Sequence, residues 1–471
     1  MNKTVNIEIL DSVHCKVDKE GRKIVKYALA YKKTNWRPAR FGKKSTIATQ
    51  YLITGRDGSG GTFGTGLLPR VKKYCKSLNI DVKTTGQIEV LKPTRKPSLL
   101  GINFREDQVK ALRKIKRNQF GRILHPTGTD KTIIELGIVS MFPNCNVLML
   151  AHTKDLVNQL KEAAENHLHY LINIFCPAGS QAVENVVNDI CFLGSSSNLI
   201  ITTIQSFAKL DPSLYIDLMD LVIVDECHHV LAEKSQYGRV MTHNLSPRRY
   251  GFTATLPTKD EHELFNQSVF GEVIAELTVE KAMEKNLIAP PRIKLLNIEY
   301  EPELNKKCQG KYYNYANLCI VNNKKRNAAI CNEAIESIKN KKPTLIIIEK
   351  IEHGKIIEKK LMAHGFIVPF ISGETPTEIR EMYKQQLIKG EELCVIVSRI
   401  WMEGISINNL ETIIYAAGMK ERKKVIQSMG RGLRTSPGKD EIVLVDCLDP
   451  YKYLAEHSIL RCQTYNEMGW I

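Results

Sequence analysis

Short apolar runs alternate with longer stretches of helical periodicity along most of the chain. One series of runs, between residues 100 and 287, reads GRILH, NVLMLA, NLIITT, LVIVDE and YGFTAT. A second series, between residues 288 and 471, reads TLIIIEK, FIVPFIS, LCVIVSR, TIIYAA and EIVLVD. Apolar strands that alternate with helices are typical of parallel sheets covered on both faces. The pattern therefore predicts two consecutive α/β domains.

The first 95 residues follow a different pattern. The segments TVNIEILDSVHCKV, RKIVKYALAYKK and STIATQYLIT are rich in Val, Ile, Thr and Tyr, which predicts strands. The segment LLPRVKKYCKSLNI predicts a helix whose apolar face comprises Leu68, Val71, Tyr74, Cys75 and Leu78. The segment VLKPTRKPSLLG is interpreted as a linker, and Pro290 and Pro291 mark the next boundary. We predict a small basic α+β domain at 1–95, then domains at 100–287 and 288–471.

The cysteines and the apolar runs indicate the cellular compartment in which the protein works. The twelve cysteines are scattered singly, without a Cys-x-x-Cys pair, which argues against a zinc site or a disulfide framework. The chain has no run of 18 apolar residues, and its N-terminus lacks the features of a signal peptide. We therefore expect a cytoplasmic protein without a membrane span.

The segment RILHPTGTDKTIIEL combines an apolar strand, a loop and a helix in the manner of a phosphate-binding loop. Backbone N–H groups of the loop and the helix N-terminus would face the β- and γ-phosphates of a nucleotide. Lys131 supplies a positive charge to these phosphates, and the Thr132 hydroxyl is a candidate ligand of Mg²⁺. The predicted nucleotide-binding residues of the loop are Thr127, Gly128, Thr129, Asp130, Lys131 and Thr132.

About 95 residues further on, the segment LVIVDECHH ends an apolar strand with two carboxylates. Asp225 is a candidate ligand of Mg²⁺, and Glu226 is a candidate to orient and deprotonate the attacking water. The next strand ends in GFTATL, where Thr253 and Thr255 carry small hydroxyl groups. Together with His228, these threonines are candidates to relay the state of the two carboxylates.

A helical pattern in VIQSMGRGLRTSPGK places Gln427, Arg431 and Arg434 at positions i, i+4 and i+7, so that one face presents all three. Arginines brought across a domain cleft would stabilise charge on a transferring phosphoryl group. Taken alone, the segment would be interpreted as a solvated basic helix. In company with the upstream motifs, the three residues are predicted to be catalytic.

Net charge adds a further partner class. The chain of 471 residues carries a formal net charge of +16. Residues 1–95 contain 20 Lys and Arg against 7 Asp and Glu, a net charge of +13, whereas the other 376 residues carry only +3. A basic domain beside an ATPase typically contacts nucleic-acid phosphates, because counterion release drives that association. A solvated domain that merely aids solubility is the alternative.

The motifs PTGTDKT, DECHH, GFTATL, SRIWMEGISINNL and QSMGRGLRT resemble, in order and interval, motifs I, II, III, V and VI of the superfamily 2 helicases. Weaker matches, INFREDQVKAL, LAHTKDLVNQL, ITTIQSFAK and FISGETPTEIR, fill the gaps, so the resemblance covers residues 100–450. Within this superfamily, EGISINNLETIIYAAG, IVLVDCLDP and GTGLLPRVKKY are similar to segments of the phage UvsW-type branch-migration helicases.

The resemblance implies two tandem RecA-like parallel-sheet domains that bind ATP and Mg²⁺ in the cleft between them. It adds Arg105 and Gln108 as residues that recognise adenine, and Gly404 as a further ATP-binding residue. It also implies contacts to single-strand phosphates, which carry little sequence preference. By position, these contacts fall on Thr153, Thr203, Gln205, Ser206, Ser372, Gly373 and Ser398.

The implied function is that of an ATP-dependent DNA helicase or translocase on forks, Holliday junctions and single-strand/duplex junctions, in replication, recombination and repair. The basic N-terminal domain would grip duplex arms. The family implies a monomer, and a bacteriophage protein of this kind would work in the bacterial host cytoplasm. Two alternatives stay open: a translocase that releases transcripts or displaces polymerases, and an ATPase-impaired, structure-selective DNA-binding protein.

Asp130 departs from the family pattern, because such loops nearly always carry glycine at this position. A carboxylate close to a triphosphate repels it and can also pair with Lys131. A Cβ atom further restricts loop conformations that glycine permits. Three explanations stay open: an active site that tolerates Asp130, a substituted variant of an active parent, and a natural DNA-binding protein that does not hydrolyse ATP.

Overall fold

The computed structural model describes the whole chain except residues 1–3, 40–41, 56–58, 170–171, 195–196, 399–406, 408, 419–438, 440 and 469, and only the backbone of residues 35–39, 42–46 and 193. The chain forms two compact units. The first comprises Met1–His125 and Asp130–Leu277, and the second comprises Pro126–Thr129 and Thr278–Ile471.

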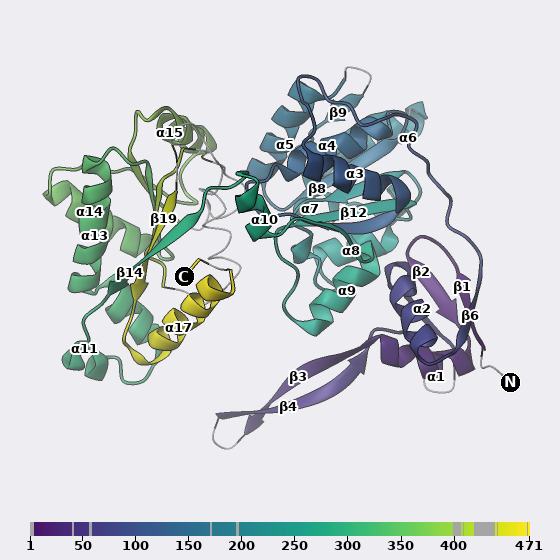
Figure 1. Ribbon diagram of the computed structural model, residues 1–471, viewed down its shortest axis with the longest axis horizontal. Coiled ribbons are helices and arrows are strands. Elements are labelled where there is room, and N and C mark those ends of the chain that lie inside the picture. The colour runs from purple at the N-terminus through teal and green to yellow at the C-terminus, as the bar shows by residue number, and fades with distance from the viewer. Residues whose placement is uncertain are drawn as a thin grey trace. The chain divides into compact units, whose positions relative to one another are not determined.

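The main sheet of the first unit, which contains β8 and β12 (Figure 1), has seven parallel strands. Their order is β13-β7-β12-β11-β8-β10-β9. The strands are β7 (Phe120–Leu124), β8 (Asn146–Ala151), β9 (Asn173–Phe175), β10 (Asn198–Thr203), β11 (Leu221–Val224), β12 (Arg248–Thr253) and β13 (Val273–Glu276). All five strands predicted between residues 100 and 287 are present. The structure adds β9 and β13 at the two edges.

Alternate residues of the central strands enter two separate cores, as the period of two in a strand requires. In β8, Val147 and Met149 pack into one core, whereas Leu148 and Leu150 pack into the other. Helices α3 (Glu106–Arg117), α4 (Lys131–Met141) and α5 (Lys154–His167) complete the first core. Helices α6 (Ser180–Leu193), α7 (Ile204–Phe207), α8 (Gln236–His243) and α9 (Asp260–Phe270) complete the second. Burial on both faces explains the continuous apolar runs.

Six parallel strands form the sheet of the second unit, in the order β14-β19-β18-β15-β17-β16. The strands are β14 (Pro291–Asn297), β15 (Thr344–Ile347), β16 (Phe370–Ile371), β17 (Cys394–Val397), β18 (Thr412–Tyr415) and β19 (Ile442–Leu448). The described helices are α10 (Val279–Glu284), α11 (Pro302–Lys307), α12 (Tyr312–Asn314), α13 (Lys324–Lys339), α14 (Ile351–Ala363), α15 (Thr377–Lys389) and α17 (Lys452–Glu467). The two sheets confirm the predicted fold class of tandem RecA-like domains.

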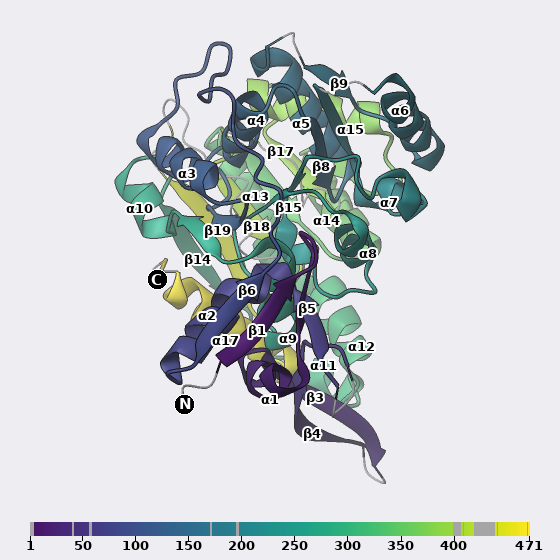
Figure 2. The same ribbon diagram turned by 90° about the vertical axis from the view of Figure 1, so that its right-hand side faces the viewer.

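A small mixed sheet precedes them, in the order β5-β2-β1-β6 (Figure 2). Strands β1 and β6 are parallel, and the other two pairs are antiparallel. Its elements are β1 (Thr4–Ile9), β2 (His14–Val17), α1 (Lys19–Ala28), β5 (Gly61–Gly64), α2 (Leu68–Ser77) and β6 (Asp81–Thr85). The predicted small α+β region is therefore confirmed.

Part of the N-terminal prediction is wrong. The segment RKIVKYALAYKK was expected to be a strand, but residues 22–28 belong to α1. The Asp18 carboxylate caps this helix by accepting a hydrogen bond from the Gly21 N–H at 2.6 Å, and Val25 and Ala28 lie on its buried face. This cap and the helical spacing of the buried positions outweigh the β-propensity of the segment. In α2, Leu78 lies beyond the last turn and is 48% exposed instead of buried.

Strands β3 (Ala30–Ala39) and β4 (Gly42–Tyr51) form a separate antiparallel hairpin that extends from the N-terminal region as an arm (Figure 1). An ion pair of 2.9 Å between Lys33 and Glu261 ties the base of this arm to α9. The N-terminal region also packs closely on α9, because a Cβ atom at Gly64 would lie only 2.7 Å from the Cβ atom of Ser268.

The division into three domains stays a prediction. In the structure, the N-terminal region and the seven-stranded sheet belong to one compact unit, and the second unit resumes at Thr278. Arg249 supports this association, since it is fully buried and donates a hydrogen bond of 2.9 Å to the Ser12 hydroxyl. Across the described residues, no helix combines the length and apolar character that a membrane span requires.

Candidate active site

The predicted phosphate loop joins β7 to α4. Gly128 in this loop has a φ of +89°, a conformation that glycine adopts at no steric cost. The Thr129 hydroxyl donates a hydrogen bond of 2.8 Å to the Pro126 carbonyl and so fixes the turn locally. Lys131 and Thr132 then form the first residues of α4 and are half-buried. The strand, loop and helix that the sequence predicts are therefore all present.

Asp130 adopts a left-handed conformation, with φ 53° and ψ 53°. This conformation explains why glycine usually occupies the position, although Asp tolerates it better than most residues do. The Asp130 carboxylate accepts a hydrogen bond of 2.9 Å from the Arg105 guanidinium, which lies 3.3 Å from Asp107 as well. A positive group therefore compensates the carboxylate in the loop. The sequence did not predict this pairing of Asp130 with Arg105.

Gln108 has a structural role at the start of α3. Its side-chain oxygen accepts a hydrogen bond of 3.0 Å from the Arg105 backbone N–H, and the side chain is buried. Arg105 and Gln108 are thus adjacent to the phosphate loop and are held by local contacts. Their proposed recognition of adenine stays a prediction.

The two carboxylates of the second motif lie directly after β11. Glu226 has a φ of +50°, and non-glycine residues in this strained region occur preferentially at functional sites. Burial and the neighbouring Glu226 charge raise the pKa of Asp225 to about 6. Burial alone would raise the pKa of Glu226 too, but a hydrogen bond from His228 and the charge of Lys131 lower it to about 2. Glu226 is therefore ionised at neutral pH.

A chain of hydrogen bonds leads from Glu226 to the end of β12. The Nδ1 atom of His228 lies 3.1 Å from a Glu226 carboxylate oxygen and 2.9 Å from the Thr253 hydroxyl. Because the Thr253 hydroxyl donates to the Thr255 carbonyl at 2.9 Å, it accepts from His228, which places the proton on Nδ1. The structure thus brings Glu226, His228, Thr253 and Thr255 together as the sequence predicted. Their role as a relay stays a proposal.

Sequence reasoning missed Glu135 and His125 near the same site. Glu135 lies in α4 and is fully buried, and burial together with the Asp225 charge raises its pKa well above the ordinary value. Burial lowers the pKa of His125 to about 4, so its imidazole is neutral. An acid inside the otherwise apolar run IIELGIVSM is the signal that could have identified Glu135.

An oxygen-lined Mg²⁺ site fits the residues present. Asp225 and Thr132 follow strands of one parallel sheet, so both lie at its carboxyl edge. Hydroxyl and carboxylate oxygens are the ligands that Mg²⁺ prefers. A divalent cation would also relieve the raised pKa of Asp225, because it favours the ionised carboxylate. Asp225 and Thr132 therefore stay the predicted ligands.

The predicted strand-contacting residues of the first unit lie at the same edge. Thr153 follows β8 and caps α5, and its hydroxyl accepts from the Leu156 N–H at 3.3 Å. Thr203 ends β10 and caps α7 by accepting from the Ser206 N–H at 3.3 Å. The Gln205 side chain donates to the His152 carbonyl at 3.0 Å. Since β8 and β10 are neighbours, the structure groups these residues.

His152 also contacts the second motif. Its ring stacks on His229, with centroids 4.1 Å apart and an interplanar angle of 6°. His229 follows His228 in the chain, so the strand-contacting group and the carboxylate group are joined by one stacked pair. Sequence reasoning did not predict this contact.

In the second unit, Ser372 follows β16 and Ser398 follows β17. The Ser398 N–H donates to the Ile371 carbonyl at 3.0 Å, which brings the two serines close together. Gly373 is exposed, and a Cβ atom there would meet nothing within 4 Å. Four further predicted residues lie outside the described part of the chain, namely Gly404, Gln427, Arg431 and Arg434.

Comparisons with known proteins agree with this geometry. The family model of the type III restriction enzyme res subunit matches residues 101–258. The family model of the helicase conserved C-terminal domain matches residues 325–436. Each match falls on one of the two parallel sheets and its motifs. The chain belongs to the superfamily 2 helicases.

Individual relatives are more distant. The chain is 24% identical over 365 residues to the ATP-dependent DNA helicase uvsW of Enterobacteria phage T4, a match that covers 73% of this chain and 71% of that protein. It is 25% identical over 398 residues to the DNA 3′-5′ translocase XPB2 of Sulfurisphaera tokodaii, which covers 77% of this chain and 85% of that protein.

Solved structures of low sequence identity share the fold. An ATP-dependent type ISP restriction-modification enzyme bound to DNA matches with a TM-score of 0.59 and 16% identity, over 80% of this chain and 30% of that one. This likeness concerns the fold alone.

Proposed function

We propose that the protein is an ATP-dependent DNA helicase or translocase that acts on branched DNA, such as forks and Holliday junctions. The observation that carries the proposal is the continuous set of contacts between the two groups of motifs. At one end, Lys131, Asp225 and Glu226 form the predicted hydrolytic site. At the other, Thr153, Thr203 and Gln205 form the predicted strand-contacting edge.

Two chains of contacts start at the second motif, and the second of them reaches the predicted strand-contacting edge. One runs from Glu226 through His228 to Thr253 and Thr255 by hydrogen bonds. The other runs from His229 to His152 by ring stacking, and on to Gln205 by a hydrogen bond to the His152 carbonyl. A change of geometry at Glu226 thus reaches the proposed DNA contacts through packed groups, as conversion of hydrolysis into movement requires.

Bound ATP with Mg²⁺ would supply the phosphoryl group that water attacks. Lys131 binds the phosphates, and ionised Glu226 orients the attacking water and accepts its proton. Asp225 and Thr132 would hold the cation. Gln427, Arg431 and Arg434 are proposed as further catalytic residues, and Gly404 as a further ATP-binding residue.

The N-terminal region supports duplex binding. It carries a net charge of +13 within residues 1–95, and its hairpin arm extends beyond the four-stranded sheet. Contacts to duplex phosphates at this arm would hold one branch of a junction while the motor tracks a strand of another. We propose forks, Holliday junctions and single-strand/duplex junctions as the substrates, bound by a monomer with little sequence preference.

The proposal is tested by ATP hydrolysis measured without DNA and with forked DNA, a Holliday junction and linear duplex of equal length. Branched DNA is expected to accelerate hydrolysis more than linear duplex. Lys131→Ala should abolish the accelerated rate, whereas Lys339→Ala, which removes an exposed lysine at the end of α13, should leave it unchanged. If no DNA accelerates hydrolysis in this chain or in Asp130→Gly, the motor function is excluded.

A second candidate is a structure-selective DNA-binding protein with impaired hydrolysis. Asp130 favours this candidate, because it has a left-handed backbone conformation and places a carboxylate in the predicted phosphate loop. It predicts junction binding that is the same with and without ATP, and the same in Lys131→Ala. A third candidate, a translocase that displaces polymerases, predicts activity on stalled transcription complexes in preference to junctions.

A further inference from the structure

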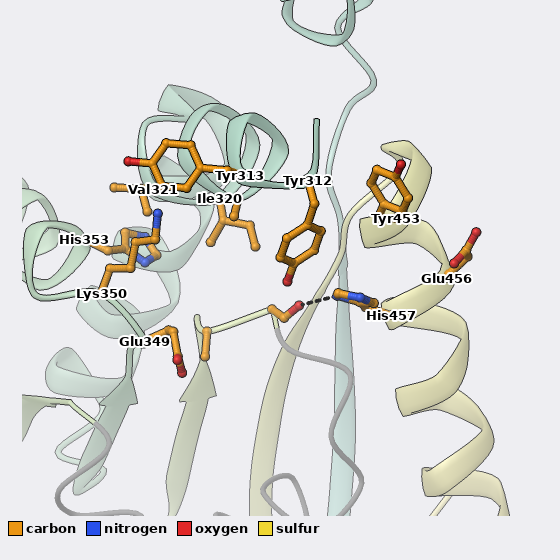
Figure 3. Close-up of a pocket in the computed structure, with 13 residues that line it drawn as sticks. Tyr312, Tyr313, Ile320, Val321, Glu349, Lys350, His353, Tyr453, Glu456 and His457 are labelled. Carbon is orange, nitrogen blue, oxygen red and sulfur yellow. Dashed lines mark hydrogen bonds between the residues drawn. The ribbon is translucent and has the colours of Figure 1, made fainter. Parts of the chain in front are cut away.

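A second site, which the helicase motifs do not use, lies entirely within the second unit. It is a cavity of about 730 Å³ between α12, the start of α14, the loop after β18 and α17 (Figure 3). Aromatic and imidazole side chains form much of its wall. These side chains are Tyr312, Tyr313, His353, Tyr453 and His457.

The rings are held in place by contacts. The Tyr312 ring lies 5.9 Å from that of Tyr453 and 5.7 Å from that of His457, measured between centroids. The Tyr453 hydroxyl donates to the Gly310 carbonyl at 3.2 Å, and its ring packs on that of Tyr315 at 5.7 Å. Figure 3 shows Tyr312, Tyr453 and His457 gathered on one side of the cavity, with Tyr313 and Lys350 on the other.

Two features indicate that these rings bind something. Tyr312 and Tyr313 are 50% and 69% exposed, although they are large aromatic side chains next to each other. They also lead into a π-helix at Tyr315–Val321, a rare conformation that occurs frequently at functional sites. The wall is therefore both exposed and built on an unusual backbone.

The charges identify the kind of ligand. Lys350 lies with its ammonium 4.7 Å from the centre of the Tyr313 ring and is the basic side chain of the wall. His353 is neutral, because burial lowers its pKa to about 3. Glu349 and Glu456 also line the cavity. This balance of charge disfavours a polyphosphate and suits a flat, uncharged ring whose N–H groups can donate to carboxylates.

The position of the cavity identifies the source of that ring. Strands β18, β15, β17 and β16 are successive neighbours in the sheet. Gly418 and Lys350 therefore lie at the same carboxyl edge as Ser398 and Ser372. Lys350 lies within two strand spacings of both serines, or about 10 Å. Both serines are predicted contacts of DNA phosphates, so a strand that they hold would have a base within reach of Tyr312 and Tyr313.

We propose that this cavity binds an unpaired base of single-stranded DNA, stacked on Tyr312 and Tyr313, with Lys350 contacting an adjacent phosphate. The assignment rests on the proposed DNA-translocating function. Every base has a π-face, so stacking here is independent of sequence. It would hold the strand between cycles of ATP hydrolysis.

The test compares two oligonucleotides without ATP. Fluorescence anisotropy measures binding of an oligothymidine and of an abasic oligomer with the same number of phosphates. The double variant Tyr312→Ala/Tyr313→Ala should bind oligothymidine about tenfold more weakly and the abasic oligomer as the parent does. Tyr312→Phe/Tyr313→Phe should bind both as the parent does, because it keeps the rings. Lys350→Ala should weaken both complexes and reduce their salt dependence by about one ion.

The matched control is Phe192→Ala, which removes a 90% exposed aromatic side chain of α6 in the first unit and should change neither affinity. Thermal unfolding checks that each variant is folded. An excess of thymidine monophosphate should not displace the oligomer, and displacement would overturn the assignment to a strand in favour of a free nucleotide. Equal binding of both oligomers by the alanine variant and the parent would overturn the base-binding site while DNA-stimulated hydrolysis still supports the motor. Failure of the parent to bind any DNA would reject both.

Discussion

Buried carboxylates at the two parallel sheets differ in their partners: those of the second unit pair with arginines, whereas those of the first lie next to one another. In the second unit, Asp449 forms a bidentate ion pair with Arg326, at 2.8 and 3.3 Å, and all of these atoms are inaccessible. Asp446 likewise accepts hydrogen bonds of 2.7 Å from Arg461 and from Tyr465. In the first unit, Asp225, Glu226 and Glu135 lie close enough to perturb one another's pKa values.

The difference separates structural from functional acids. A buried carboxylate with a bidentate arginine is a fixed part of the core, and removal of one partner leaves an uncompensated charge. A group of carboxylates with pKa values shifted in opposite directions is typical of a site that handles a cation or a proton. The carboxylates at the first sheet therefore have the features of a catalytic site, whereas those at the second sheet form structural ion pairs.

The largest effect is expected for Glu226→Gln. Loss of the carboxylate proposed to orient water should reduce DNA-stimulated ATP hydrolysis by about 100-fold or more. Binding of a fluorescent ATP analogue should be retained, since the variant keeps Lys131, the proposed phosphate contact. A variant that hydrolyses ATP at the parental rate would show that Glu226 belongs with the structural acids.

The next effect is on stability. Arg326→Leu leaves Asp449 buried without its bidentate partner and should lower the free energy of unfolding by about 3–5 kcal/mol. The double variant Arg326→Leu/Asp449→Leu should recover much of this loss, because no charge is then buried alone. Denaturant unfolding of both variants measures the difference, and equal stability of the single variant and the parent would contradict the structural role.

A smaller effect is expected for Asp130→Gly. Glycine removes the left-handed strain, a gain of about 1 kcal/mol in the free energy of unfolding, and the partly exposed ion pair with Arg105 offsets little of it. Removal of the negative charge should lower the KM for ATP. Arg105→Ala should raise this KM in the parent more than in Asp130→Gly, because only the parent then has an uncompensated carboxylate. If Arg105→Ala raised the KM equally in the parent and in Asp130→Gly, Arg105 would not compensate the charge of Asp130.

The smallest effect depends on pH. The pKa of Glu135 is raised by burial, so the folded protein binds a proton that the unfolded chain releases, and stability falls as pH rises above the unfolded value. The raised pKa of Asp225 likewise makes stability fall with rising pH, up to about pH 6. Glu226 is already fully ionised at that pH. Glu135→Gln should match the parent at pH 5 and exceed its stability at pH 8, by on the order of 1 kcal/mol. Thermal unfolding across this range measures the difference, and parallel curves would show that Glu135 does not titrate.

The amino-acid sequence determined the strands and the motifs. NVLMLA and NLIITT coincide with β8 and β10, because buried parallel strands need apolar residues at every position. Motif spacing likewise indicated that Lys131, Asp225, Glu226 and Thr253 lie at one edge of the sheet, since each ends a strand or comes after one. The strand predicted at residues 22–28 was wrong, because it relied on the local preference of β-branched residues for strands. The Asp18 cap and the buried face of α1 favour the helix instead.

Only the tertiary structure decided the contacts between residues far apart in the chain. Arg105 meets Asp130 across two elements, and Tyr312 meets Tyr453 although 140 positions separate them. No periodicity in the sequence encodes such pairs, because they depend on how the strands and helices are arranged in space. Strand order is a property of the folded sheet, and it placed the ends of β18, β15, β17 and β16 along one edge. Helices α12 and α17 then supply most of the aromatic wall of the cavity.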